Sequence, residues 1–175
     1  MADHIDNGLA AAIKALDDVV AKSIDPSNPL AREQLKLVAR YLGFLRQRLP
    51  YRHERDRFEL AHYTELAREL LPTSEECSVL DAPSLAATVQ VGQSVLDDPS
   101  ASAAQIKAAV DGLTTALSVL VRGAAVADEQ LRRRIELKVT LASAALFDVQ
   151  RAWYMPMGFE PDPGRVPALE RALAK

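Results

Sequence analysis

The chain has few of the residues that usually carry catalysis, metal binding or disulfide bonding. Its 175 residues include one cysteine, three histidines, seven glycines and nine aromatic side chains. A single cysteine cannot form an internal disulfide, which favours a reducing cytoplasm. Neither the G-x-G-x-x-G nor the G-x-x-x-x-G-K-[ST] phosphate-binding loop occurs. We therefore expect neither a dinucleotide-binding protein nor a P-loop protein.

Long apolar runs and a strong net charge are also absent. The longest uncharged stretch, residues 82–96, contains Ser, Thr, Gln and Pro, so we expect no membrane-spanning helix. The first residues include Asp3, His4 and Asp6 and lack the basic and apolar regions of a signal peptide. The net charge is −3, which gives no support for binding to nucleic acid. These features predict a cytoplasmic protein.

Alanine and leucine dominate what is present. Together they supply 53 residues, or 30% of the chain, and both favour helices over strands. Apolar residues recur at spacings of three and four through most of the sequence. We therefore predict an all-α, single-domain bundle of five or six mainly antiparallel helices over residues 1–155. A proline-rich arm with a short helix follows over residues 156–175. The alanine content and the 15 arginines among 21 basic residues indicate a bacterial origin.

Capping signals and prolines give the expected helix boundaries. Three starts are predicted by a capping residue, at Asn28 before Pro29, at Asp81, and in the capping box Ser102-x-x-Gln105. We expect Pro72 to end a helix and Gly123 to cap another.

Two further features bear on the boundaries. The sequence Thr73-Ser74-Glu75-Glu76 resembles a second capping box, which predicts a short helical turn up to Leu80. At Leu49-Pro50-Tyr51 we expect a tight reversal, with a kinked continuous helix as the alternative.

An arginine-rich segment is the first candidate binding site. Arginine presents a planar fork that suits phosphate or carboxylate groups. The segment predicts a site for a small anionic ligand, either phosphorylated or CoA-like, or for the acidic patch of a protein partner. The alternative is a solvated helix junction whose arginines pair with nearby acids. The candidate residues are Arg48, Arg52, His53, Arg55 and Arg57.

A Glu-x-x-His pattern is the second candidate. Glu59 and His62 would lie on adjacent turns of one helix face, as in the ligands of carboxylate-bridged di-iron bundles. Such a site needs a second Glu-x-x-His, and the chain has none. The alternative is a solvated Glu59 beside a His62 at the edge of the core. We therefore expect no metal or other cofactor.

The third candidate is a self-association surface. Leu137 and Leu141 lie outside the main apolar stripe of the helix that ends near Tyr154, and a cluster of large apolar residues follows. Such residues are common in interfaces, although capping of the protein's own core and a ligand pocket are the alternatives. The candidate interface consists of Leu137, Leu141, Trp153, Met155, Met157 and Phe159.

No catalytic constellation emerges from the sequence. There is no G-x-S-x-G elbow, and Cys77 follows two glutamates, whose charges disfavour a reactive thiolate. We therefore expect a non-catalytic helical interaction or accessory protein that forms a homodimer. The first alternative is a bundle that binds a small anionic ligand through the Arg48–Arg57 segment. The second is a metal-dependent enzyme that uses Glu59 and His62.

Overall fold

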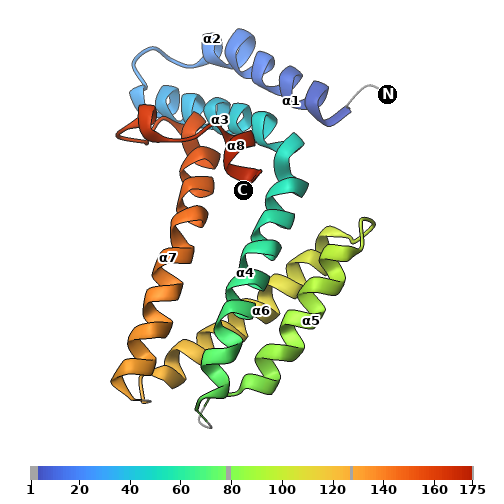
Figure 1. The fold of residues 1–175 in the computed structure, drawn as a ribbon. Helices are drawn as coiled ribbons and strands as arrows, with labels where there is room; N and C mark the ends of the chain where they lie inside the picture. Colours follow the sequence, from blue (N-terminus) through green and yellow to red (C-terminus); the bar gives the residue numbers. More distant parts are fainter. Residues whose placement is uncertain (1–3, 78–79, 127, 175) are drawn as a thin grey trace. The chain divides into compact units, whose positions relative to one another are not determined.

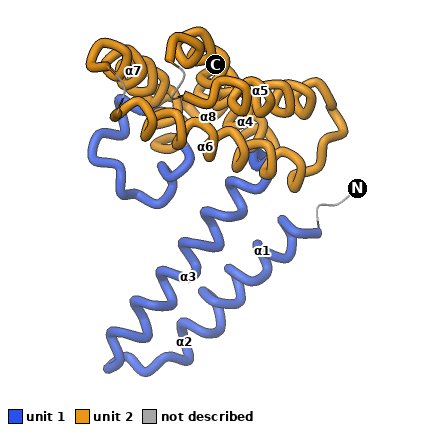
Figure 2. Tube along the Cα trace, turned by 90° about the horizontal axis from the view of Figure 1, so that it is seen from below, with its two compact units in different colours: residues 1–52, 153–166 blue, residues 53–152, 167–175 orange. Residues whose placement is uncertain are grey.

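The protein is all-α, as the sequence predicts. The computed structural model describes residues 4–77, 80–126 and 128–174, and all regular structure within these ranges is helical (Figure 1). The chain divides into two compact units (Figure 2). The first unit comprises residues 1–52 and 153–166, and the second comprises residues 53–152 and 167–175. The boundary expected at residue 155, between a helical bundle and a C-terminal arm, stays a prediction.

The first unit is built around two helices. Its elements are α1 (His4–Ala15), the π-helical turn η1 (Leu16–Val20), α2 (Ala21–Ser23), α3 (Pro29–Arg48), and the 3₁₀ turns η2 (Leu49–Tyr51), η3 (Met155–Met157) and η4 (Pro163–Arg165). In η1 the amide of Ala21 donates to the carbonyl of Leu16, a five-residue step that shifts the helical register. The helix expected over residues 5–24 is therefore interrupted by a π turn that apolar spacing did not reveal.

Helix α3 begins where its capping signal predicts. The Asn28 side chain accepts a hydrogen bond from the amide of Ala31 at 3.0 Å, and Pro29 is the first helical residue. Helix α1 lies along α3 (Figure 1). Arg46 and Asp6 join the two helices through Nε–Oδ1 at 2.6 Å and Nη2–Oδ2 at 3.0 Å.

The segment Leu49–Tyr51 is a 3₁₀ turn. Arg48, Leu49 and Arg52 all have right-handed helical backbone angles, so the chain passes from α3 to α4 without an extended residue. The backbone is therefore helical at these residues, and the expected reversal stays a prediction.

The second unit contains the larger core. Its elements are α4 (Arg52–Glu75), α5 (Ala82–Asp97), α6 (Ala103–Ala124), α7 (Glu129–Tyr154) and α8 (Leu169–Leu173). Helices α5 and α6 lie side by side and antiparallel (Figure 1). Asp81 caps α5 by accepting from the Ser84 amide at 3.1 Å, and Ser102 with Gln105 forms the predicted capping box of α6. The largest fully buried apolar side chains of this unit are Leu60, Leu70, Leu85, Ile106, Leu113, Leu131 and Ile135.

Two predicted helix ends are wrong. Pro72 lies inside α4, which continues to Glu75, so Thr73-Ser74-Glu75-Glu76 is not a capping box. Thr73 and Ser74, which follow the proline, are buried, and the Ser74 hydroxyl donates to the Leu71 carbonyl at 2.7 Å. The turn expected up to Leu80 falls partly on residues 78–79, which lie outside the described residues.

Gly123 also lies within a helix rather than after it, because Ala125 is the residue that caps α6. A Cβ atom at Gly123 would lie 2.9 Å from Leu80 Cδ2, so the glycine makes room for a core leucine.

Among the described residues, α6 is the one helix whose length and apolar composition would allow it to cross a membrane. One face of it, with Ile106, Leu113 and Leu117, is buried in the core of the second unit. Core helices of water-soluble proteins pass the same test of length and composition.

Candidate functional site

The arginine segment is divided between the two units. Arg48 and Arg52 belong to the first unit, whereas His53, Arg55 and Arg57 belong to the second. Among these residues, Arg52 and His53 are exposed and the other three are half-buried. The anion-binding role of the segment stays a prediction.

Arg48 is held by the chain itself. Its Nε atom donates to the carbonyl oxygen of Trp153 at 2.7 Å, and its guanidinium lies 5.9 Å from the centre of the Trp153 ring. A cation over an indole face is an attractive arrangement. Nearby in the same unit, the buried Phe44 ring stacks on Tyr154 with a centroid distance of 5.7 Å. Arg48 therefore stabilises the segment that begins at Trp153.

Arg57 caps the end of a helix. Its guanidinium donates to the carbonyl oxygen of Leu96, in the last turn of α5, and to that of Asp98 at 3.3 Å. The last four carbonyls of a helix have no partner within that helix, so a cationic donor there is stabilising. The donors that Arg48 and Arg57 use in these contacts are not available to a ligand.

Glu59 and His62 both lie on α4, about one turn apart. Within the described residues no group of three or more His, Cys, Asp or Glu side chains is arranged to hold a metal ion. The His62 ring instead packs between aromatic neighbours, with centroid distances of 6.1 Å to Phe58 and 5.2 Å to Tyr63. These contacts agree with the alternative of a histidine at the edge of the core.

Partial burial changes the acid–base properties of two neighbouring side chains. Burial lowers the pKa of His62 below its usual 6.5, because a low-dielectric surrounding disfavours the charged imidazolium. Burial also raises the pKa of Tyr63, with a further contribution from the negative charge of Glu59. At neutral pH this part of α4 therefore presents a neutral imidazole and a neutral phenol.

Two hollows meet at His62. The first, of about 520 Å³, lies between α4, α5 and α7 and is lined by Arg68, Glu65 and Gln93 among others. Arg68 is paired there with Glu65 and donates to Gln93 at 2.7 Å. The second hollow, of about 410 Å³, lies between α4, α6 and α7. His62 and Leu66 line both hollows.

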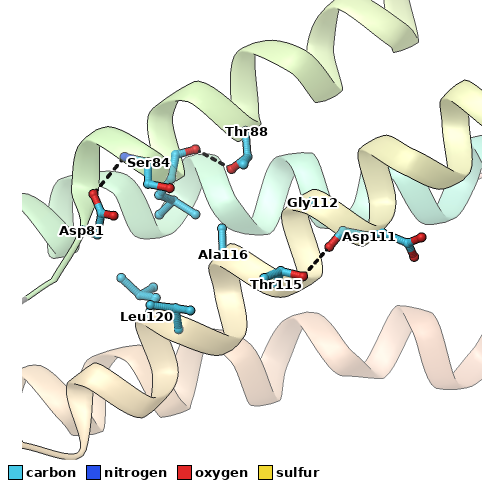
Figure 3. Close-up of a pocket in the computed structure, with 10 residues that line it drawn as sticks. Asp81, Ser84, Thr88, Asp111, Gly112, Thr115, Ala116 and Leu120 are labelled. Atoms are coloured by element: carbon cyan, nitrogen blue, oxygen red, sulfur yellow. Dashed lines mark hydrogen bonds between the residues drawn. The ribbon is translucent and has the colours of Figure 1, made fainter.

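A further hollow of about 500 Å³ lies between α5 and α6 (Figure 3). Figure 3 shows Ser84 and Thr88 on α5 and Thr115 and Ala116 on α6 along its walls. The Thr88 and Thr115 hydroxyls donate to carbonyls of their own helices, at 2.8 and 2.7 Å. These hydroxyl donors are therefore already used within their own helices.

The apolar residues predicted on the last long helix are exposed. Leu137 is 60% exposed and Leu141 is 67% exposed, and Phe147 on the same helix is 63% exposed. Ala144 is also exposed. The opposite side of α7 carries the buried residues Leu131, Ile135 and Val149. Helix α7 therefore has apolar residues on both its buried side and its exposed side.

The segment that follows α7 is less open. Trp153 is only 7% exposed and Met155 and Met157 are half-buried, whereas Phe159 is 74% exposed. An interface role for these four residues stays a prediction. The end-cap alternative also stays a prediction.

Sequence reasoning did not identify the residues that surround His62 in three dimensions. Tyr63, Arg122 and Ser143 all line the hollow of about 410 Å³, although they come from three different helices. Of these three residues, only Tyr63 could be placed near His62 from the sequence, because the two are neighbours along the chain.

Comparison with known proteins identifies no relative: no protein-family model, no curated protein sequence and no solved structure matches the chain.

Proposed function

We propose that the protein is a non-catalytic helical interaction protein that associates with a second copy of itself through α7. The observation that carries this proposal is a row of exposed apolar residues on a helix whose opposite side is already buried. We call this row the α7 stripe, and it consists of Leu137, Leu141, Ala144 and Phe147. Contiguous exposed apolar surface on a water-soluble protein usually marks an interaction site.

The residues of the α7 stripe share one face of the helix. Their spacing of four, three and three follows the helical repeat over about three turns. The stripe is about 15 Å long at 1.5 Å per residue. It is therefore the right shape for contact with another helix rather than with a small molecule.

Charge and size complementarity favour a second copy in the antiparallel orientation. In a two-fold pair of α7 helices centred between Thr140 and Leu141, Arg133 would lie opposite Asp148 of the second copy. The same register would place Leu137 opposite the small Ala144 of the second copy. Arg133 is paired with Glu129 on its own helix, but an exposed pair one turn apart contributes only about 0.3–0.5 kcal/mol. The pair would replace this contact of Arg133 and the interaction that Asp148 already makes within its own chain.

The size of the stripe sets the expected strength of the dimer. Stable interfaces bury about 1,200–2,000 Å², and a single helix pair buries less than this. We therefore expect a weak, reversible dimer with a dissociation constant in the micromolar range. A cytoplasmic location belongs to the same proposal, because Cys77 is a free thiol and suits a reducing compartment.

Sedimentation velocity over a range from about one to a few hundred micromolar tests this proposal. The wild-type protein should shift from monomer to dimer as the concentration rises. The double variant Leu137→Glu with Leu141→Glu should stay monomeric, because it places charges in the stripe. Val91→Glu replaces an exposed apolar residue on α5 and is the matched control, which should dimerise like the wild type. A monomer at every concentration, or a dimer that tolerates the double variant, would contradict the proposal.

A further inference from the structure

The hollow between α4, α6 and α7 has apolar walls. Leu66 comes from α4, Leu117 from α6, and Val139 and Leu146 from α7. Its volume of about 410 Å³ lies within the range typical of small-molecule sites. These walls suit the apolar body of a small ligand.

The hydroxyl groups of the hollow are already used as donors. Thr114 donates to the Val110 carbonyl at 2.9 Å, Ser118 to the Thr114 carbonyl at 2.7 Å, and Ser143 to the Val139 carbonyl at 2.8 Å. All of these acceptors belong to the same helix as the donor. These hydroxyls therefore do not offer a proton to a ligand.

Two polar groups of the hollow differ from these hydroxyls. No side chain among the described residues forms an ion pair or hydrogen bond with the guanidinium of Arg122 or with the hydroxyl of Tyr63. Both groups are donors. Arg122 lies at the solvent-exposed rim of the hollow and is the one Lys, Arg, Asp or Glu among its lining residues. The polar side of the hollow is therefore suited to an acceptor of negative charge.

We propose that this hollow binds a small apolar molecule with a single anionic head group, such as a medium-chain carboxylate. The apolar body lies against Leu66, Leu117, Val139 and Leu146, and the head group accepts hydrogen bonds from Arg122 and Tyr63. This site is separate from the α7 stripe, so the proposal does not depend on dimer formation. It is also separate from the Arg48–Arg57 segment.

The test uses three probes with the same eight-carbon chain and different head groups: octanoate, 1-octanol and octylammonium. Their affinities are measured by isothermal titration calorimetry, and the site is located from changes in backbone amide NMR shifts. Octanoate should bind about tenfold more tightly than either other probe, because a hydrogen bond to a charged group is worth more than a neutral one. The shift changes should centre on Tyr63, Arg122 and Ser143.

Two variants and a control identify the groups responsible. Arg122→Gln should remove the preference for octanoate and leave the affinity for 1-octanol unchanged. Val139→Trp should fill the hollow and weaken the binding of both probes, with circular dichroism confirming the fold. Arg40→Gln, at an exposed position of α3, should bind all three probes like the wild type. Equal affinity for octanoate and 1-octanol, the same preference in Arg122→Gln, or no binding of octanoate would overturn the proposal.

Discussion

Gly92 of α5 lies so close to Thr64 of α4 that a Cβ atom at residue 92 would stand 2.5 Å from Thr64 Oγ1. Leu113 Cδ1 on α6 would lie 3.0 Å from the same atom. Thr64 is itself buried, and its hydroxyl donates to the Leu60 carbonyl at 2.7 Å. The absence of a side chain at Gly92 therefore allows three helices of the second unit to meet.

This relationship predicts that Gly92→Ala destabilises the protein. Overpacking a core costs about 1–3 kcal/mol, and replacing a helical glycine by alanine returns about 0.5–1 kcal/mol. We expect a net loss of about 1–2 kcal/mol in the free energy of unfolding, measured by urea denaturation.

Gly112→Ala is the control for this variant. Gly112 lies in α6 with no atom within 4 Å of an added Cβ, so the same change there should stabilise the protein by about 0.5–1 kcal/mol. Adding Thr64→Ala should reduce the cost of Gly92→Ala in a double-mutant cycle. If Gly92→Ala proved as favourable as Gly112→Ala, the close approach of α4 and α5 would be wrong.

Arg57 should contribute to stability through its contacts with α5. Arg57→Met keeps much of the aliphatic stem but leaves the Leu96 and Asp98 carbonyls without these donors. We expect a loss of about 1–2 kcal/mol in thermal or urea denaturation. Arg40→Met, at an exposed position of α3, should stay within about 0.5 kcal/mol of the wild type. If both variants changed the stability equally little, the contacts of Arg57 with α5 would contribute nothing measurable to the free energy of unfolding.

Local signals in the sequence were enough to place several helix boundaries. Asn28, Asp81 and Ser102 each cap the helix that the sequence predicts, because capping depends on residues within one turn. The exposure of Leu137 and Leu141 also follows from the helical repeat, since they lie outside the buried stripe of α7.

Features that depend on distant residues were not predictable in this way. Gly123 stays helical where it makes room for the distant Leu80. The hollow beside His62 is formed by three helices, so the place of Arg122 in its lining has no signature in the neighbouring sequence. In each case a contact across the fold overrides or adds to the local preference.

The burial of His62 predicts a loss of stability at mildly acidic pH. Its pKa is lowered in the folded protein, so the unfolded chain binds more protons near and below pH 6.5. Stability that is present at pH 7 should therefore fall as the pH decreases toward 5. Thermal denaturation of His62→Gln should show a smaller loss over this range. Carboxylates whose pKa values are lowered by hydrogen bonds, including Asp6 and Glu76, should add a further loss that begins near pH 5 and grows below their ordinary pKa values of 3.8 and 4.5.

His53→Gln is the comparison for this effect, because His53 is exposed on the same helix. It should keep the wild-type loss between pH 7 and 5. The charged groups that line the hollows beside His62 are Glu65, Arg68, Glu69 and Arg122. If His62→Gln lost as much stability between pH 7 and 5 as the wild type, the loss would come from other groups and the prediction for His62 would be wrong.

Trp153 should be one of the most important residues for stability. It is 7% exposed, and its carbonyl and ring both contact Arg48. Trp153→Ala should lower the free energy of unfolding by about 3 kcal/mol or more, and Trp153→Phe should cost less. Phe159→Ala removes an exposed ring and should change stability by about 0.5 kcal/mol at most. A small effect of Trp153→Ala would contradict the burial of the indole.

The antiparallel pairing of α7 is tested most directly by distances between spin labels on two copies of the chain. The labels are placed at Glu136→Cys or Gln150→Cys, two exposed positions of α7, with Cys77→Ser to remove the native thiol. A pair centred between Thr140 and Leu141 predicts intermolecular distances of roughly 15 to 20 Å at position 136 and roughly 30 Å at position 150. Similar short distances at both positions, or no intermolecular signal at concentrations of hundreds of micromolar, would contradict the account.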